Sequence, residues 1–179
     1  MAEELKDEVV EALEAVEEFE EDGQKGMFMT FQTGKEYYGI SISYVNEIIT
    51  MQPITAIPEV ENYIKGLINL RGKIIPVIDV RARFKMEPQE YTDRNCIIVI
   101  DVKSTVIGLI VEKIAEVDSI LEDDIMPPPA LSHKNTERNK YIYGLARTGN
   151  TVKLLLEPER LIQQDVLNVI EDIKEKEQS

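Results

Sequence analysis

Residues 61–80 read ENYIKGLINLRGKIIPVIDV, and this stretch decides the fold of the chain. It contains two short apolar runs, Leu67–Leu70 and Lys73–Asp79, on either side of Gly72. Short runs rich in Ile and Val that flank a glycine turn are typical of paired β-strands. Pro76 cannot donate a hydrogen bond to a neighbouring strand, so we expect it at a sheet edge or a bulge.

Arg71 is a charge placed between two apolar strands. A charge flanked by apolar residues is costly to remove from water unless it is paired. Two interpretations are open: a solvated turn, or an ion pair with Glu47, which is the charged residue among Val45, Ile48 and Ile49.

The same pattern of short apolar runs separated by turn residues extends in both directions, from Met27 to Leu156. Candidate strands are Met27–Thr33, Tyr37–Ile42, Val45–Met51, Leu67–Leu70, Lys73–Asp79, Asn95–Asp101, Thr105–Val111, Ala115–Leu121, Tyr143–Arg147 and Val152–Leu156. Pro58–Lys65 and Val80–Met86 are expected to be short helical or turn segments. Many short strands with brief helices favour small closed barrels, because closure removes exposed strand edges.

An internal repeat supports this architecture. Sliding the chain by 69 residues places Gly39 on Gly108 and Glu47 on Glu116 within matching apolar positions. A weaker match aligns the segment around Gly66 with that around Gly144. We therefore predict an all-β fold of two five-stranded units, about 27–90 and 91–160, packed together. Glycine within a strand usually marks a bulge or a tight bend.

The two ends differ from this body in charge. The chain carries a net charge of −14, of which residues 1–25 contribute 11 acids and 2 bases. Residues 3–21 place apolar side chains at helical spacing, which predicts an acidic amphipathic extension ending near residue 26. That helix either only solubilises the chain or docks into a groove, and residues 163–179 predict a short C-terminal helix.

The residues that usually carry chemistry are scarce. Cys96 begins an apolar strand, which favours a buried, inert thiol, and His133 is the one histidine. Neither a GxGxxG nor a GxxxxGK[ST] phosphate loop occurs. We therefore expect no catalysis, no cofactor and no metal. The chain has no apolar run long enough for membrane insertion, and its acidity disfavours nucleic acid. These features predict a soluble cytoplasmic protein.

The quoted stretch resembles the central motif of the CheW family of bacterial chemotaxis coupling proteins. The resemblance extends over about 27–162, through segments that surround Gly39, Glu47, Gly108 and Met126-Pro127-Pro128-Pro129. It implies two five-stranded SH3-like barrels. It also implies a non-enzymatic adaptor that joins methyl-accepting chemoreceptors to the histidine kinase CheA, recruited to receptor arrays at the inner face of the membrane. The acidic front, the triple proline and the charged tail depart from the family's usual pattern.

The resemblance also implies two binding surfaces. The receptor surface, along the groove between the two units, would include Val45, Glu47, Gly66, Arg71 and Gly108. The kinase surface would be the apolar tip of the first barrel, at Ile49, Met51 and Ile54. Gly66 and Gly108 can instead be required because a side chain would clash inside the barrel. The alternative function is a small-molecule-binding β-barrel, which would need a wet cavity that so many large Ile, Val and Leu side chains disfavour.

Overall fold

The computed structural model describes residues 6–11, 26–128 and 137–178, and strands are their commonest secondary structure. The strands are β1 (Met27–Thr33), β2 (Glu36–Ser41), β3 (Val45–Thr50), β4 (Ile64–Leu70), β5 (Lys73–Asp79), β6 (Cys96–Val102), β7 (Thr105–Val111), β8 (Lys113–Ser119), β9 (Ile142–Thr148) and β10 (Thr151–Leu156). The helices are α2 (Val80–Arg83), α3 (Pro158–Leu161) and α4 (Gln164–Gln178), with short 3₁₀ helices η1 (Ile42–Tyr44), η2 (Glu122–Asp124) and η3 (Glu137–Lys140). All ten predicted strands are confirmed, with small shifts at their ends.

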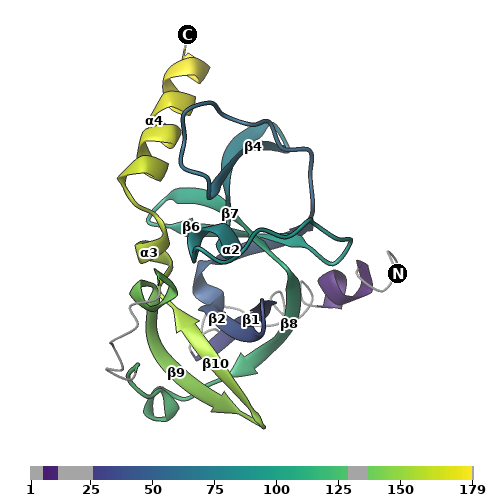
Figure 1. Cartoon of the computed structure of the whole chain (residues 1–179), viewed down its shortest axis with the longest axis vertical. Helices are drawn as coiled ribbons and strands as arrows, with labels where there is room; N and C mark the ends of the chain where they lie inside the picture. Colours follow the sequence, from purple (N-terminus) through teal and green to yellow (C-terminus); the bar gives the residue numbers. More distant parts are fainter. Residues whose placement is uncertain (1–5, 12–25, 129–136, 179) are drawn as a thin grey trace.

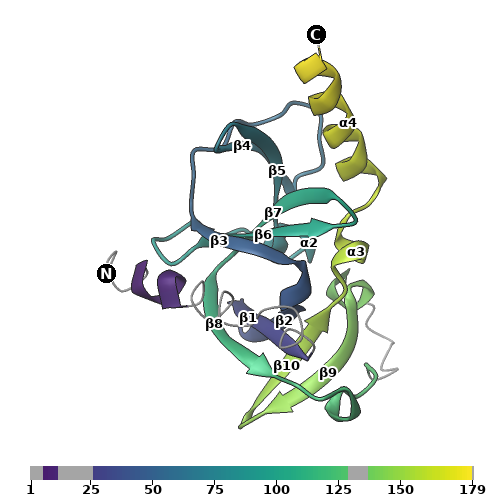
Figure 2. The same ribbon diagram turned by 180° about the vertical axis from the view of Figure 1, so that it is seen from behind.

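The strands form two five-stranded sheets, one above the other in Figures 1 and 2. We call them sheet A, with the order β8-β1-β2-β10-β9, and sheet B, with the order β3-β6-β7-β5-β4. In each sheet one parallel pair, β2–β10 or β5–β7, joins two antiparallel groups. The predicted all-β class with two similar five-stranded units is confirmed.

The predicted division into residues 27–90 and 91–160 is wrong, because each sheet takes strands from both segments. Strands β1–β5 and β6–β10 are the two repeats, and each sheet joins the first hairpin of one repeat to the last three strands of the other. Equivalent residues occupy equivalent places: Gly39 pairs with Thr30 and Leu155, and Gly108 pairs with Val99 and Val77. The repeats are therefore interlocked, not consecutive.

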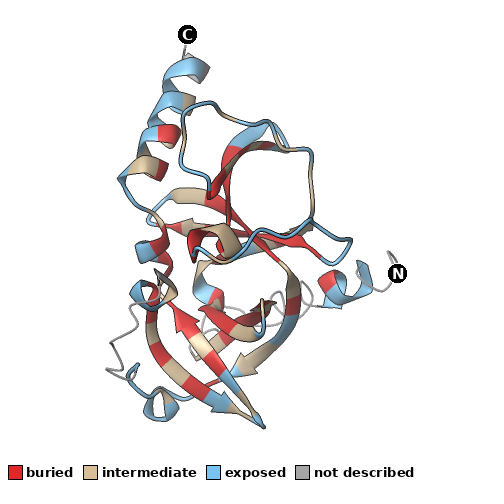
Figure 3. Cartoon of the chain, viewed as in Figure 1, coloured by how far each residue is buried: buried red, intermediate tan, exposed pale blue. Residues whose placement is uncertain are grey.

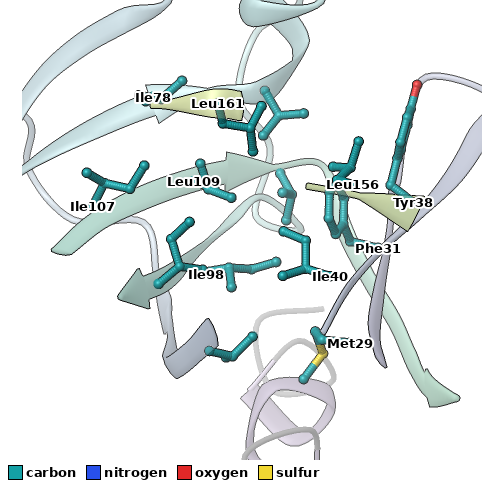
Figure 4. Close-up of a cluster of buried hydrophobic side chains, with 14 of the residues drawn as sticks. Met29, Phe31, Tyr38, Ile40, Ile78, Ile98, Ile107, Leu109, Leu156 and Leu161 are labelled. Atoms are coloured by element: carbon teal, nitrogen blue, oxygen red, sulfur yellow. The ribbon is translucent and has the colours of Figure 1, made fainter. Parts of the chain in front are cut away.

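The largest core lies between the two sheets. Figure 4 shows Phe31 and Ile40 of sheet A facing Ile98 and Leu109 of sheet B, and all four are fully buried. Figure 3 shows this buried layer along the strands where the sheets meet. Strand β6 serves two cores, because Ile98 faces sheet A while Ile97 faces the interior of sheet B. The apolar run of its first five residues, Cys96 to Ile100, reflects burial on both faces.

Sheet B encloses a second core of its own. We call it the B interior, and it consists of Ile68, Ile75, Val77, Ile97, Val99 and Ile110, with Ile49, Met51, Ile54, Leu70 and Val106 packed at its margin. The corresponding core of sheet A is smaller and contains Phe28, Ile120, Ala146 and Leu155. Branched aliphatic side chains fill the B interior, which does not favour the alternative of a small-molecule-binding barrel.

Pro58–Lys65, expected to be a short helical or turn segment, forms turns, and strand β4 begins within it at Ile64. The expectation that Pro76 lies at a sheet edge or a bulge was incorrect. Strand β5 lies inside its sheet, yet Pro76 sits one residue before the first β5–β7 pair, Val77–Gly108. The missing amide hydrogen of Pro76 therefore removes no bond to β7.

The ends of the chain pack against the body where the structure describes them. Residues 6–11 are helical and Val9 is buried in the core between the sheets, which fits the docking interpretation for this part of the N-terminal segment. Helix α4 is a regular helix of 15 residues, with Val166 buried and Ile170 and Ile173 packed at the core margin. It is longer than the short tail helix that the sequence predicted.

Candidate functional site

Three residues of the predicted receptor surface lie on one line across sheet B. Strand pairing connects Glu47 to Val99, Val99 to Gly108, Gly108 to Val77, and Val77 to Gly66. Side chains of directly paired residues point to the same face of a sheet. Because Val77 and Val99 belong to the B interior, this line runs along the inner face of sheet B.

Glu47 and Arg71 form an ion pair that connects the two edges of sheet B. Glu47 lies on edge strand β3, and Arg71 lies in the turn that follows the opposite edge strand, β4. The Arg71 Nη2 donates to Glu47 Oε2 at 2.5 Å. The Arg71 side chain is 71% exposed and that of Glu47 is 22% exposed. Of the two interpretations of Arg71, the structure has the ion pair, and most of the guanidinium-bearing side chain remains exposed to solvent.

The turn itself holds Arg71 in place. Arg71 and Gly72 have φ angles of 51° and 87°, which is typical of a two-residue hairpin turn with both central residues left-handed. The backbone N–H of Gly72 donates to Asn69 Oδ1 at 2.9 Å. This local network fixes the direction in which Arg71 leaves the sheet.

Gly66 is buried beneath the segment that follows β3. Its φ is +144°, and a Cβ at this position would lie 2.1 Å from the carbonyl oxygen of Thr55. Thr55 and Leu67 exchange two backbone hydrogen bonds of 2.9 Å across this contact. Gly66 is therefore needed for close backbone packing, as one of the two sequence interpretations stated.

Gly108 and Val45 are also buried. A Cβ on Gly108 would lie 2.7 Å from Ile97 Cγ2 and 2.8 Å from Val77 Cγ1, inside sheet B. Val45 is 8% exposed and belongs to the core between the sheets. Of the five residues assigned to the receptor surface, Glu47 and Arg71 reach solvent, whereas Val45, Gly66 and Gly108 support the fold around them.

Ile49, Met51 and Ile54 lie together at one margin of the B interior. Each is partly exposed, so this apolar rim is available for contact while its members pack inward. The sequence placed them at the tip of a barrel made of residues 27–90. The structure places them at the margin of sheet B, which also contains β6 and β7.

Glu116, the residue that matches Glu47 in the repeat, also forms an ion pair, in sheet A, which the sequence analysis missed. Lys153 is 2% exposed, and its Nζ lies 3.3 Å from Glu116 Oε1 and 3.8 Å from Asp118 Oδ2. The ammonium also lies 4.4 Å from the centre of the Tyr37 ring. Burial raises the pKa of Asp118, Glu116 raises it further, and Lys153 and Thr148 oppose both effects. The match of Glu47 with Glu116 in the repeat was the signal that could have led to it.

Residues with potential for chemistry do not converge on a reactive centre in the described part of the chain. Cys96 is buried, and burial raises the pKa of its thiol to about 12, which fits the predicted inert thiol. His133 lies outside the described residues. Within 6–11, 26–128 and 137–178, no three His, Cys, Asp or Glu side chains are grouped as a metal site requires. Over the same residues, every helix is too short or too polar to cross a membrane.

Comparison with known proteins agrees along the whole body. Residues 27–166 match the family model described as the CheW-like domain. "Chemotaxis protein CheW" of Klebsiella aerogenes is 31% identical over 146 residues, which is 82% of this chain and 87% of that protein. The protein of the same name from Bacillus subtilis is 39% identical over 115 residues, or 64% of this chain and 72% of that protein. The crystal structure of the scaffolding protein TtCheW from Thermoanaerobacter tengcongensis superimposes with a TM-score of 0.68 at 34% identity, covering 74% of this chain and 88% of that chain.

Proposed function

Because the chain belongs to the CheW-like domain family, we propose that it is a non-enzymatic scaffold of bacterial chemotaxis. It would couple methyl-accepting chemoreceptors to the histidine kinase CheA in the cytoplasm, at receptor arrays on the inner face of the membrane. The observation that carries the proposal is the family match over residues 27–166, which includes all ten strands.

The receptor contact is assigned to Glu47 and Arg71. Their ion pair is accessible, and the charged groups are held by an edge strand and a well-defined turn. An arginine offers five fixed donors, so Arg71 can keep Glu47 and still donate to a carboxylate or carbonyl on a receptor. Val45, Gly66 and Gly108 act through the shape of the sheet that carries this pair.

The kinase contact is assigned to the rim of Ile49, Met51 and Ile54. Apolar side chains at the margin of a packed core suit a protein interface, because they are already partly ordered and burying them on association costs little further conformational entropy. Both surfaces belong to sheet B, so a rigid sheet would hold receptor and kinase in a fixed relation. A receptor state with higher affinity for this frame would then change the state of the bound kinase.

Reconstitution tests the proposal directly. Purified receptor signalling tips and CheA are mixed with and without the full chain, and kinase autophosphorylation is measured. We expect the chain to change kinase output in the presence of receptor tips. An unchanged output at saturating concentrations of all three proteins would refute the coupling role.

Matched variants separate the two surfaces. Arg71→Glu should weaken receptor binding, whereas Arg147→Glu, at an exposed arginine of β9, makes the same charge change in sheet A and should not. Met51→Ser should weaken CheA binding and leave receptor binding intact. Equal losses for Arg71→Glu and Arg147→Glu would show that net charge, and not this ion pair, governs binding.

A further inference from the structure

A concave surface lies beside strand β4, between α4 and the segment that follows β3. We call it the α4 groove: a cleft of about 530 Å³ between residues 55–61 and one face of α4. Figure 1 shows α4 running beside the loop next to β4 at the end of the molecule. The proposed function does not use this surface.

The floor of the α4 groove is apolar and comes from three elements. Val169 and Ile173 are contributed by α4, where a spacing of four residues places them on the same face. Opposite them stand Ile57 and Val60, and strand β4 provides Ile64. Most of these side chains are partly exposed, so the floor retains apolar surface that a partner can cover.

The rim of the groove is acidic on both walls. Glu59 and Glu61 line one wall, and Asp165 and Asp172 line the other. Lys176 is the cation among the lining residues, so four carboxylates face one ammonium group. An apolar floor between two acidic walls favours an occupant with apolar side chains in the middle and cations on either side.

The charge of the rim disfavours occupants from this chain. Residues 1–25 include an amphipathic pattern but carry 11 acids and 2 bases, and a second copy of the chain carries a net charge of −14. Like charges would face each other in both cases. We propose that the α4 groove docks a basic amphipathic helix of a partner protein, with apolar side chains seated between Val60 and Ile173 and Lys or Arg over the carboxylates.

The test uses the full chain and two labelled helical peptides. One peptide has Leu on one face and Lys on the others, and the second has Glu in place of each Lys. Binding is followed by fluorescence anisotropy at low and at moderate salt. We expect the Leu/Lys peptide to bind and to weaken with salt, and the Leu/Glu peptide not to bind.

Charge-reversal variants locate the site. Glu59→Lys combined with Asp172→Lys reverses one carboxylate on each wall and should weaken the Leu/Lys peptide by about tenfold. Glu122→Lys combined with Asp123→Lys makes the same change in net charge on η2, where both residues are exposed, and should have little effect. Ile173→Ser should weaken binding without any change in charge.

Three results would overturn the proposal. Equal weakening by the two double variants would show that the peptide responds only to the acidity of the chain. Equal binding of the Leu/Lys and Leu/Glu peptides would show that the acidic rim does not contribute to binding. A dimer in sedimentation that is lost in Glu59→Lys/Asp172→Lys would assign the groove to a second copy of the chain. Each result is independent of the coupling test, because none of them involves receptor tips or CheA.

Discussion

Replacing Gly66 by alanine tests whether this glycine shapes the sheet or touches a partner. The backbone at Gly66 has a φ of +144°, which residues with a Cβ rarely adopt, and this strain costs about 1–2 kcal/mol. The new Cβ would also lie 2.1 Å from Thr55 O, so the Thr55–Leu67 contact must open. Loss of its two hydrogen bonds adds roughly 1 kcal/mol each.

The expected loss in the free energy of unfolding is therefore about 3 kcal/mol. For a protein of this size, that corresponds to a decrease in Tm of about 10 °C. Circular dichroism during heating and during urea titration measures both quantities. Gly66→Ala should also weaken receptor binding, but in proportion to the fraction of unfolded protein.

Gly72→Ala is the matched control for the cost of placing a residue with a Cβ at a positive φ. Gly72 also has a positive φ, 87°, but no atom lies within 4 Å of the position a Cβ would occupy. Its replacement should cost about 1 kcal/mol, because only the conformational preference changes. If Gly66→Ala is no more destabilising than Gly72→Ala, the close approach of Thr55 does not constrain the fold, and the structural explanation of Gly66 is wrong.

Three further predictions concern charged and buried groups. Arg71→Glu should weaken receptor binding, and combining it with Glu47→Arg should recover part of the loss; additive losses in binding assays would argue against the pairing. Lys153→Met should lower the free energy of unfolding by about 2 kcal/mol at pH 7 and by less at pH 4, because the raised pKa of Asp118 leaves more of this carboxyl protonated in acid; urea titration at both pH values decides this. Cys96 should resist alkylation at pH 8 until the protein is denatured, and alkylation of the folded protein at the rate of free cysteine would contradict its burial. The free energy of unfolding should also fall as the pH rises from 9 towards 12, because in this range only the unfolded chain ionises the thiol.

Sequence patterns predicted the strands well because their signals are local. Strands β1, β5 and β7 have the predicted ends, and each is an apolar run bounded by turn residues. The pair Glu47–Arg71 was one of two interpretations of the sequence, because a charge flanked by apolar residues either stays in water or takes a partner. Of the two conformations expected at Pro58–Lys65, helix or turn, the structure has turns, because the pairing of Thr55 with Leu67 and the start of β4 at Ile64 leave no room for a helix.

The interlocking of the repeats was not predictable from the same patterns. Strands β3 and β8 occupy equivalent positions in the two repeats, with Glu47 equivalent to Glu116. From the sequence, each of them could therefore pair with the first hairpin of its own repeat or with that of the other repeat. A choice between two nearly identical pairings depends on loop lengths and packing that a single sequence does not display. Lys153 was missed for a related reason: its partners Glu116 and Asp118 lie on β8, and a lysine between apolar residues looks solvent-exposed until that strand is placed.

The exchange of hairpins between repeats has a consequence for how the chain is made. Strand β3 leaves the ribosome well before β6, the neighbour with which it pairs, and β1 must wait for β8. The hairpins β1–β2 and β4–β5 can form early. Neither half of the chain alone can complete a sheet, so completion of both sheets waits until most of the polypeptide has been synthesised. A cut near residue 90 would leave two pieces, each with unsatisfied strand edges, that regain structure only by associating with each other.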